Sequence, residues 1–425
     1  MKTLLKLIFI GIIIGVTIYA LDEKKINVKD TARHIVELAM QKIAQLKKIS
    51  QEELDQQRDI AEPVSPSSES GNSVVTTNRP YKSPDKAKAR IDLTDTNIRP
   101  TEIPIRSRPG QNNKRYNELD QYAASVPEAF EENLDALVKY LVKPAKNNLE
   151  RTRLVFSWIA FHVSYDDHGY NTGQYGDLSA EGVFKRRVAV CQGFSELFKI
   201  MGEKAGLDIL LVTGYAKGIS YREGQSFNDT NHAWNLVYLD NKWRLFDVTW
   251  AQGYGTAVNR KLVSIKKFDD YWFNTSPDEF IFSHLPENPK WQLTSTQLTK
   301  SQFERLPYAS ASYFKLGFDG TKCLQQSVEG SLTSFPESYL NDGSVRALSL
   351  PHKKEIKAHQ PITIRLTSER SADIAVINNG EWVHLRKDGN EYMAVIDPQP
   401  GNLKLSARFD QQSSSYNTLL EYRVN

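Results

Sequence analysis

The stretch "RRVAVCQGFSELFKIMGEKAG", residues 186–206, decides how the middle of this 425-residue chain folds. Its large apolar side chains are spaced at i, i+3, i+4 and i+7, which predicts a helix with one buried face. These side chains are Phe194, Leu197, Phe198 and Met201. Gly206 is typical of the residue that follows a helix C-terminus. Cys191, one of only two cysteines, is therefore predicted at the N-terminus of the helix, on its buried side.

A thiol at this position has two interpretations. The unpaired backbone N–H groups and the dipole of a helix N-terminus favour an anion, which lowers the pKa of a thiol. The same N–H groups can hold a developing oxyanion. A lone cysteine, however, is more often a small, inert apolar side chain in a core. The choice depends on whether a suitable base lies nearby.

A predicted hairpin supplies that base. The segments "HAWNLVYL" (232–239) and "KWRLFDVTW" (242–250) both read as strands, and only two residues separate them. With a two-residue turn, the numbers of each facing pair sum to a constant, and His232 and Asp247 become diagonal neighbours on one face. Their Cβ atoms would then lie roughly 7–8 Å apart or somewhat closer, within reach of a hydrogen bond between the side chains. A bulge in either strand would break this register.

Three residue types then suit one chemistry. An imidazole oriented by a carboxylate can take the proton of a thiol, and the thiolate can attack a carbonyl carbon. Taken alone, His232 and Asp247 would also fit a surface pair. Bulky apolar residues surround both of them in "NHAWN" and "LFDVTW", which favours a partly buried, functional pair. The sequence therefore predicts a triad of Cys191, His232 and Asp247.

Four separated segments carry a family resemblance. They are similar to the transglutaminase-like superfamily, and more closely to its kyphoscoliosis-peptidase-like branch: "VCQGFSELFKIMGEKAGL", "VTGYAKG", "NHAWNLVYLDNKWRLFDVTW" and "DDYWFNTSPDEFIFSHLPENPKWQL". The similarity runs from about Tyr116 to Leu293, and the β-rich region behind it also resembles that branch. It implies an α+β, papain-like thiol fold in which Cys191 is the nucleophile, His232 the base and Asp247 the orienting acid.

Four further residues are candidates for the cleft or the oxyanion site. The resemblance implies that "HVSYDD", around Tyr165, helps to wall the cleft, although a core tyrosine is at least as good an interpretation. Gln192 follows the thiol at the helix start. Trp234 and Trp250 fit either a substrate cleft or the core, and the position of Trp234 on the triad's face favours the cleft.

The resemblance leaves three functions open. If water resolves the acyl-enzyme, the protein is a peptidase or amidase; if a lysine does, it is a crosslinking transglutaminase. Many members of the superfamily are thought to be inactive scaffolds, so a silent scaffold or adhesion module is the rival from another class. We expect a thiol-dependent enzyme acting on amide bonds of proteins or peptides. No acidic "DxDxDG" loop supports calcium dependence.

Composition excludes several other classes. The 54 basic and 51 acidic residues nearly balance, so no nucleic-acid partner is expected. Two cysteines exclude a disulfide-rich scaffold and a multi-cysteine zinc site. His162 and His168 have no third ligand at metal spacing. We therefore predict no metal and no cofactor.

The N-terminal region predicts export. In residues 1–21, two lysines precede an apolar run, which is typical of a signal segment. Poor cleavage residues favour an uncleaved signal anchor over a cleaved signal peptide, placing the rest outside the cytoplasm, in the periplasm or at the cell surface. Cleavage would make the protein secreted. Residues 22–58 predict a helical stalk or a partner-binding helix, and 59–115, rich in Pro, Ser, Thr and Asn, predict a disordered linker.

The remaining chain divides into two parts. Helical patterns followed by strands assign residues 116–300 to the catalytic α+β domain. Residues 301–425 form a β-rich C-terminal region, in which short alternating strands from about 345 predict an immunoglobulin-like β-sandwich. Hairpin turns are expected at "NNG" (378–380) and "KDGNE" (387–391). The β-domain is expected to present substrate or to bind a protein partner.

Overall fold

The computed structural model describes residues 114–339 and 343–425. The predicted signal segment, the predicted stalk and all but the last two residues of the predicted linker lie outside the described residues. The first helix within the described residues, α3 (Lys114–Ala124), begins two residues before the expected domain start at 116. Within the described ranges, no helix is long and apolar enough to cross a membrane.

The first part of the fold is helical, and its helices begin where the sequence supplies caps. Asn133 caps α4 (Leu134–Leu141), and Asn147 caps α5 (Asn148–His162), each accepting a backbone N–H bond. The central helix α8 (Cys191–Lys204) buries all four residues of the predicted apolar stripe at 0% exposure. The other elements here are a 3-10 turn (Glu128–Phe130), β1 (Ser164–Tyr165), α6 (Asp167–Thr172), α7 (Ala180–Arg186) and β2 (Val188–Ala189).

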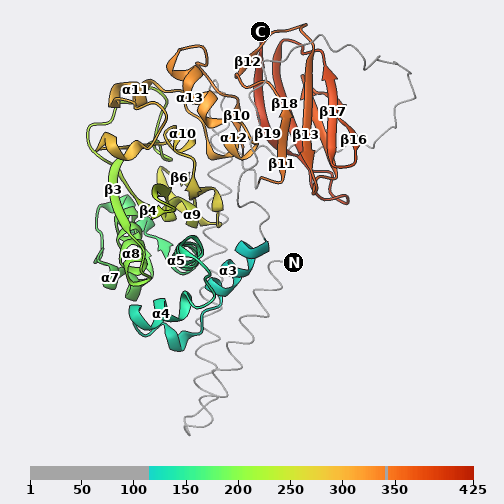
Figure 1. The fold of residues 1–425 in the computed structure, drawn as a ribbon. Coiled ribbons are helices and arrows are strands. Elements are labelled where there is room, and N and C mark those ends of the chain that lie inside the picture. The colour runs from blue at the N-terminus through green and yellow to red at the C-terminus, as the bar shows by residue number, and fades with distance from the viewer. Residues whose placement is uncertain (1–113, 340–342) are drawn as a thin grey trace, which may run out of the picture. The chain divides into compact units, whose positions relative to one another are not determined.

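A five-stranded antiparallel sheet follows these helices. Its strand order is β8-β5-β4-β3-β9, and α8 packs against β3 and β4 while α5 packs against α8 (Figure 1). The α+β class is thereby confirmed for this part of the chain. The strands are β3 (Ile209–Ala216), β4 (His232–Leu239), β5 (Lys242–Phe246), β8 (Phe273–Thr275) and β9 (His284–Pro286).

The β4–β5 hairpin has the predicted register at five of its eight predicted facing pairs. Facing pairs run from Leu239↔Lys242 to Asn235↔Phe246, and their numbers sum to 481 throughout. The prediction of a strand as far as residue 250 is wrong, because the chain leaves the sheet at Asp247 and starts α9 (Val248–Gln252). The side chain of Asp247 caps that helix by accepting the Trp250 N–H bond, and such local capping outcompetes strand pairing.

Several shorter elements complete this part. A separate hairpin of β6 (Gly253–Val258) and β7 (Lys261–Lys266) follows α9 directly (Figure 1). The remaining pieces are 3-10 turns at Asp270–Trp272 and Pro289–Gln292, α10 (Pro277–Phe280), α11 (Lys300–Arg305), α12 (Ala311–Lys315) and α13 (Gly320–Val328). The segment after residue 300 contacts both neighbours: Leu306 O accepts a bond from Lys217 Nζ at 2.7 Å, and Leu316 O accepts one from Ala347 N at 2.8 Å.

The C-terminal region contains two sheets, as the alternating strands predicted. One has the order β10-β19-β18-β14-β15, with β12 pairing parallel to β19, and the other has the order β11-β13-β17-β16. Both expected hairpin turns are present, between β14 and β15 and between β16 and β17. The strands are β10 (Glu337–Ser338), β11 (Val345–Ser349), β12 (Glu355–Ile356), β13 (Ile362–Ser368), β14 (Asp373–Asn378), β15 (Glu381–His384), β16 (Arg386–Asp388), β17 (Glu391–Ile396), β18 (Gly401–Arg408) and β19 (Asn417–Val424).

Candidate active site

Cys191 is the first residue of α8, and its side chain is partly exposed. No side chain caps this helix, because the preceding residue is Val190. The helix start therefore keeps backbone N–H groups that no side chain occupies, and these favour negative charge. The other cysteine, Cys323, is fully buried in α13, and burial raises the pKa of its thiol to about 12. The two thiols thus lie in opposite electrostatic settings.

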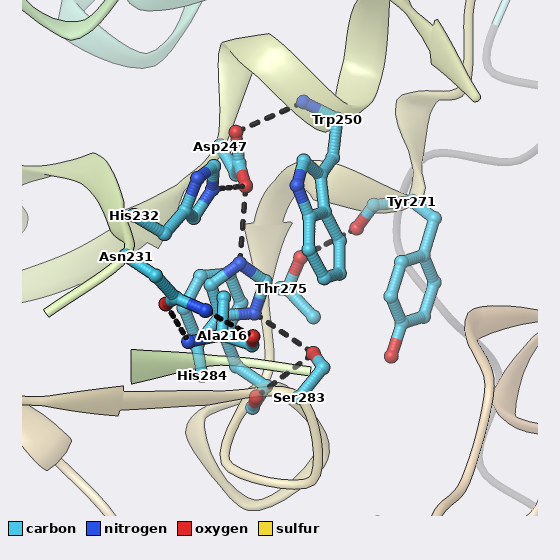
Figure 2. A network of polar contacts seen from close by, with 10 residues as sticks. Ala216, Asn231, His232, Asp247, Trp250, Tyr271, Thr275, Ser283 and His284 are labelled. Carbon is cyan, nitrogen blue, oxygen red and sulfur yellow. Dashed lines mark hydrogen bonds and ion pairs between the residues drawn. The ribbon is translucent and has the colours of Figure 1, made fainter. Parts of the chain in front are cut away.

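His232 is held at the start of β4 by its neighbour. The side chain of Asn231 accepts the Ala216 N–H bond at 2.7 Å and donates to the same residue's carbonyl at 3.0 Å, joining the start of β4 to the end of β3 (Figure 2). The imidazole of His232 is 9% exposed, and its Nε2 atom lies 2.8 Å from Oδ2 of Asp247. The predicted pairing of these two side chains is present although the strand pairing that motivated it stops earlier.

Asp247 is fully buried, and its two oxygens have different partners. Oδ1 accepts the backbone N–H of Trp250 at 2.9 Å, which caps α9. Oδ2 accepts from His232 and also from Nε2 of His284, the latter at 3.1 Å (Figure 2). The backbone N–H of Asp247 itself donates to Trp272 O. The carboxylate is therefore fixed in place by its strand end, its helix and two histidines.

His284 is the residue that sequence reasoning missed. It begins β9, is 0% exposed, and its Nδ1 atom lies 2.8 Å from Oγ of Ser283. Its ring stacks on that of Phe280, with 4.0 Å between the ring centroids, and its centroid lies 4.3 Å from that of the Trp250 ring. The segment "FSHLPENPKWQL" contributed to the family resemblance, but nothing local assigned a partner to this histidine. The pairing of β9 with β3, which sets Ala216 opposite His284, brings it to the site.

The electrostatics favour an ion pair between thiolate and imidazolium. Burial raises the pKa of Cys191, but hydrogen bonding to His232, the charge of that ring and the Ala233 N–H together lower it below the usual value. Burial lowers the pKa of His232, but the charge and hydrogen bond of Asp247 raise it to about 10. His232, and to a lesser extent His284, hold the pKa of Asp247 well below its ordinary range, against burial. His232 therefore stabilises the charged forms of both Cys191 and Asp247, whereas the charge of Asp247 by itself disfavours the thiolate.

The four residues predicted for the cleft or the oxyanion site differ in how deeply they are buried. The hydroxyl of Tyr165 is close enough to Cys191 for the charge of the thiolate to raise its pKa further, although burial is the larger cause. Gln192 is the second residue of α8 and is partly exposed. Trp250 is also partly exposed, 5.4 Å from the His232 ring. Trp234 is 0% exposed and stacks beneath His232, so assigning it to an open cleft was wrong: it packs in the core under the site.

His232, Asp247 and His284 also form a cluster that could be mistaken for a metal site. One nitrogen or oxygen atom from each lies within 4.8 Å of the others. Ligand atoms on a tetrahedral zinc ion would be about 3.3 Å apart, given zinc–ligand distances near 2 Å. The observed distances of 2.8 and 3.1 Å to Oδ2 are those of charge-assisted hydrogen bonds instead. We therefore describe the cluster as a hydrogen-bond network.

The fold and the site define an α+β domain in which a cysteine at a helix start adjoins a buried histidine–aspartate pair, and comparison with known proteins identifies its family. Residues 135–248 match the family model of the transglutaminase-like superfamily, a range that contains Cys191, His232 and Asp247. The chain therefore carries a transglutaminase-like domain, and the resemblance predicted from the motifs is confirmed. His284 lies beyond the matched residues.

The kyphoscoliosis-peptidase-like branch is also supported. The chain is 28% identical over 316 residues to kyphoscoliosis peptidase from Homo sapiens, covering 73% of this chain and 43% of that protein. It is 28% identical over 214 residues to hillarin from Drosophila melanogaster, covering 48% and 26%. It thus spans less than half the length of these curated relatives. A crystal structure of a TGase aligns at 23% identity with a TM-score of 0.24, covering 39% of this chain and 44% of that one, and we draw nothing from it.

Proposed function

We propose that the protein is a thiol-dependent enzyme that acts on amide bonds of proteins or peptides, most simply as a peptidase or amidase. The observation that carries this proposal is the 2.8 Å contact between His232 Nε2 and Asp247 Oδ2, in a buried pair that adjoins a helix-start thiol of lowered pKa. Buried titratable groups with shifted pKa values and a specific partner are typical of active sites.

The geometry assigns a role to each member. With Nε2 bound to Asp247, Nδ1 is the ring nitrogen left for the Cys191 thiol. The thiolate attacks the carbonyl carbon, and the imidazolium gives its proton to the departing amine. This leaves an acyl-enzyme and a neutral imidazole, which then takes a proton from water. The hydroxide attacks the acyl carbon and releases the thiolate. If a primary amine replaces water, the product is a new amide.

Two further roles concern stabilisation of the oxyanion and positioning of the Asp247 carboxylate. In this proposal the backbone N–H groups at the start of α8, including that of Gln192, hold the oxyanion that forms on the attacked carbonyl next to Cys191, and the absence of a side-chain cap on the helix supports this role. His284 donates its Nε2–H to Asp247, provided that Nδ1 accepts the Ser283 hydroxyl proton. In this role His284 is a positioning residue that keeps the carboxylate ionised and aligned with His232.

The test is the pH dependence of alkylation by iodoacetamide, measured separately on Cys191 and Cys323 by peptide mass spectrometry. Cys191 should titrate below the unperturbed thiol value of about 8.5, and His232→Ala should remove that reactivity. Cys323, buried with its pKa raised to about 12, should stay unmodified and so reports that the chain remains folded.

The chain offers a matched control for the histidine. His384 lies on β15 with its Nδ1 2.6 Å from Asp373 Oδ2, an exposed histidine–aspartate pair in the β-rich region. His384→Ala should leave alkylation of Cys191 unchanged. If Cys191 titrates near 8.5 and His232→Ala has no effect, the chain is a scaffold and the proposal is wrong. Incubation of an active enzyme with a fluorescent primary amine then separates crosslinking, which incorporates the amine, from hydrolysis.

A further inference from the structure

The β6–β7 hairpin presents an apolar face to solvent. Its register pairs Tyr254 with Ile265 and Thr256 with Val263, so these side chains share one face of the ribbon. Tyr254, Val263 and Ile265 are 36%, 40% and 39% exposed, and Val258 beyond them is 49% exposed. Four large apolar side chains on one exposed face of a two-stranded ribbon are unusual, because such a ribbon normally turns its apolar face inward.

The two edges of this hairpin differ. Along β7, Leu262 exchanges hydrogen bonds of 2.8 and 2.9 Å with the Asn171 side chain, and the Ser264 N–H bonds to Asp167 Oδ2, so α6 covers that edge. Because these groups point away from β6, the facing residues Gly255 and Ala257 direct their own N–H and C=O groups away from β7. Within the described residues, nothing bonds to this outer edge of β6.

The hairpin is attached to the elements that hold the candidate triad. Its first strand continues from α9, the helix that Asp247 caps. Its second strand is bonded to α6, which directly follows β1. In turn β1 pairs with β2, setting Tyr165 opposite Ala189, two residues before Cys191. The Lys266 ammonium group also donates to Val163 O at 3.1 Å. Both strands of the hairpin are therefore joined to elements that hold or adjoin the candidate triad.

The charge of the hairpin indicates what would bind there. Residues 253–267 contain four basic residues and no acidic one. Arg260, Lys261 and Lys267 are all exposed, and none of them is in an ion pair with a described carboxylate. An open strand edge beside an apolar face is a site for addition of an extended peptide, and the cations select its charge.

We propose that β6 binds an extended, acidic segment of the protein substrate as an added strand. Backbone bonds to Gly255 and Ala257 hold the segment, its alternate apolar side chains extend the face of Tyr254 and Val258, and its carboxylates pair with the cations around the turn. This inference rests on the proposed function and adds the substrate class: unfolded or extended acidic regions. The experiment below measures binding without turnover, so its outcome is independent of the chemistry.

The probe is a fluorescein-labelled peptide, acetyl-Glu-Val-Glu-Val-Glu-Val-Glu-amide, with a counterpart in which lysine replaces each glutamate. Fluorescence anisotropy follows their binding to the full chain carrying Cys191→Ser. We expect the acidic peptide to bind at least about tenfold more tightly than the basic one. The double variant Arg260→Glu, Lys261→Glu should reverse that preference. The same charge change at exposed positions of the β-rich region, Lys353→Glu with Lys357→Glu, is the control and should not.

Ala257→Pro tests the backbone pairing. It removes an N–H group that points outward from β6 and breaks no hydrogen bond to β7, and an edge strand tolerates proline at such a position. This substitution should weaken binding of the acidic peptide about fivefold, which is the loss in affinity expected for one hydrogen bond. Val258→Asn, which makes the apolar face polar without adding a charge or altering a backbone group, should also weaken binding of the acidic peptide. Circular dichroism melting checks that each variant folds. Equal binding of both peptides, or unchanged binding in both Ala257→Pro and Val258→Asn, overturns the proposal. The proposal is also overturned if neither peptide binds and the chain forms a dimer that these variants abolish, because the apolar face would then bind a second copy of the chain.

Discussion

Nε2 of His284 lies 3.1 Å from Oδ2 of Asp247, the same carboxylate oxygen that Nε2 of His232 approaches at 2.8 Å. One buried carboxylate oxygen thus accepts hydrogen bonds from two histidines, and these two histidines differ in charge. Interaction with Asp247 raises the pKa of His232 to about 10, whereas burial lowers the pKa of His284 to about 4. Near neutral pH, His232 is therefore a cation and His284 a neutral donor.

Replacing His284 should lower the reactivity of the Cys191 thiol, although His284 acts on it only through Asp247 and His232. In His284→Phe, Asp247 loses a donor worth about 1.5–3 kcal/mol for a charged acceptor, so the carboxylate is less firmly aligned with the His232 imidazolium. The apparent pKa of Cys191 should rise, and alkylation at pH 7 should slow by about tenfold or more. His284→Gln, which keeps an N–H donor, should recover part of the rate. A pH profile of alkylation identical to that of the parent in His284→Phe would show that this histidine only fills space.

Two substitutions at Asp247 should separate its two functions. Asp247→Asn keeps an oxygen that can accept the Trp250 N–H, so α9 remains capped, but it removes the charge that holds the His232 imidazolium. Asp247→Ala removes both and should lose about a further 1 kcal/mol of stability, as expected for a missing helix cap. Chemical denaturation measures the stabilities, and alkylation of Cys191 should fall in both variants. Equal stability of the two variants would contradict the capping role.

Lys217 should make stability rise with pH. Its side chain is 1% exposed, and burial lowers its pKa from the ordinary 10.5 to about 7, although Glu223 and Glu304 act in the opposite direction. The folded pKa lies below the unfolded one, so between pH 7 and 10.5 the unfolded state binds more protons. Stability should therefore increase across that window, by at most about 1.4 kcal/mol per pH unit from this group.

The comparison of Lys217→Met with its parent by urea unfolding at several pH values isolates this contribution. The variant should lose that part of the slope, and it should also lose the bond that Lys217 Nζ donates to Leu306 O at 2.7 Å. Lys357→Met, at an exposed position, is the control and should retain the parent slope. An unchanged slope in Lys217→Met would mean that the lysine remains protonated when buried.

Gly214 should tolerate no side chain, since three strands meet there. A Cβ atom at this position would lie 2.2 Å from Leu285 O and 2.5 Å from the Trp234 ring. Gly214→Ala must therefore displace β9, which carries His284, and should cost about 1–3 kcal/mol as an overpacked core. Gly218→Ala is the matched control, because its nearest contact would be an ordinary 3.6 Å to Trp250. Thermal melting that does not distinguish the two variants would contradict this packing.

Much of the site followed from local sequence patterns. The apolar spacing after Cys191 predicted α8, and the two-residue turn predicted the β4–β5 register, because helix and hairpin geometry depend on residues that are close in the chain. The pattern failed at Asp247, where a strand was expected and a helix begins. The side chain that should have pointed from a strand face became a helix cap instead. Local periodicity does not show which of these two uses an aspartate adopts.

The sequence by itself determined the helix that starts at Cys191, the meeting of His232 with Asp247 and the family resemblance. Only the tertiary structure decided that Trp234 lies in the core, that His284 completes the contacts of the carboxylate and that the outer edge of β6 is open. The reason is physical: these features depend on pairings such as β3 with β9, between segments about 70 residues apart in the chain. Such pairings are chosen by the burial and hydrogen bonding of the whole domain, which short sequence patterns do not record.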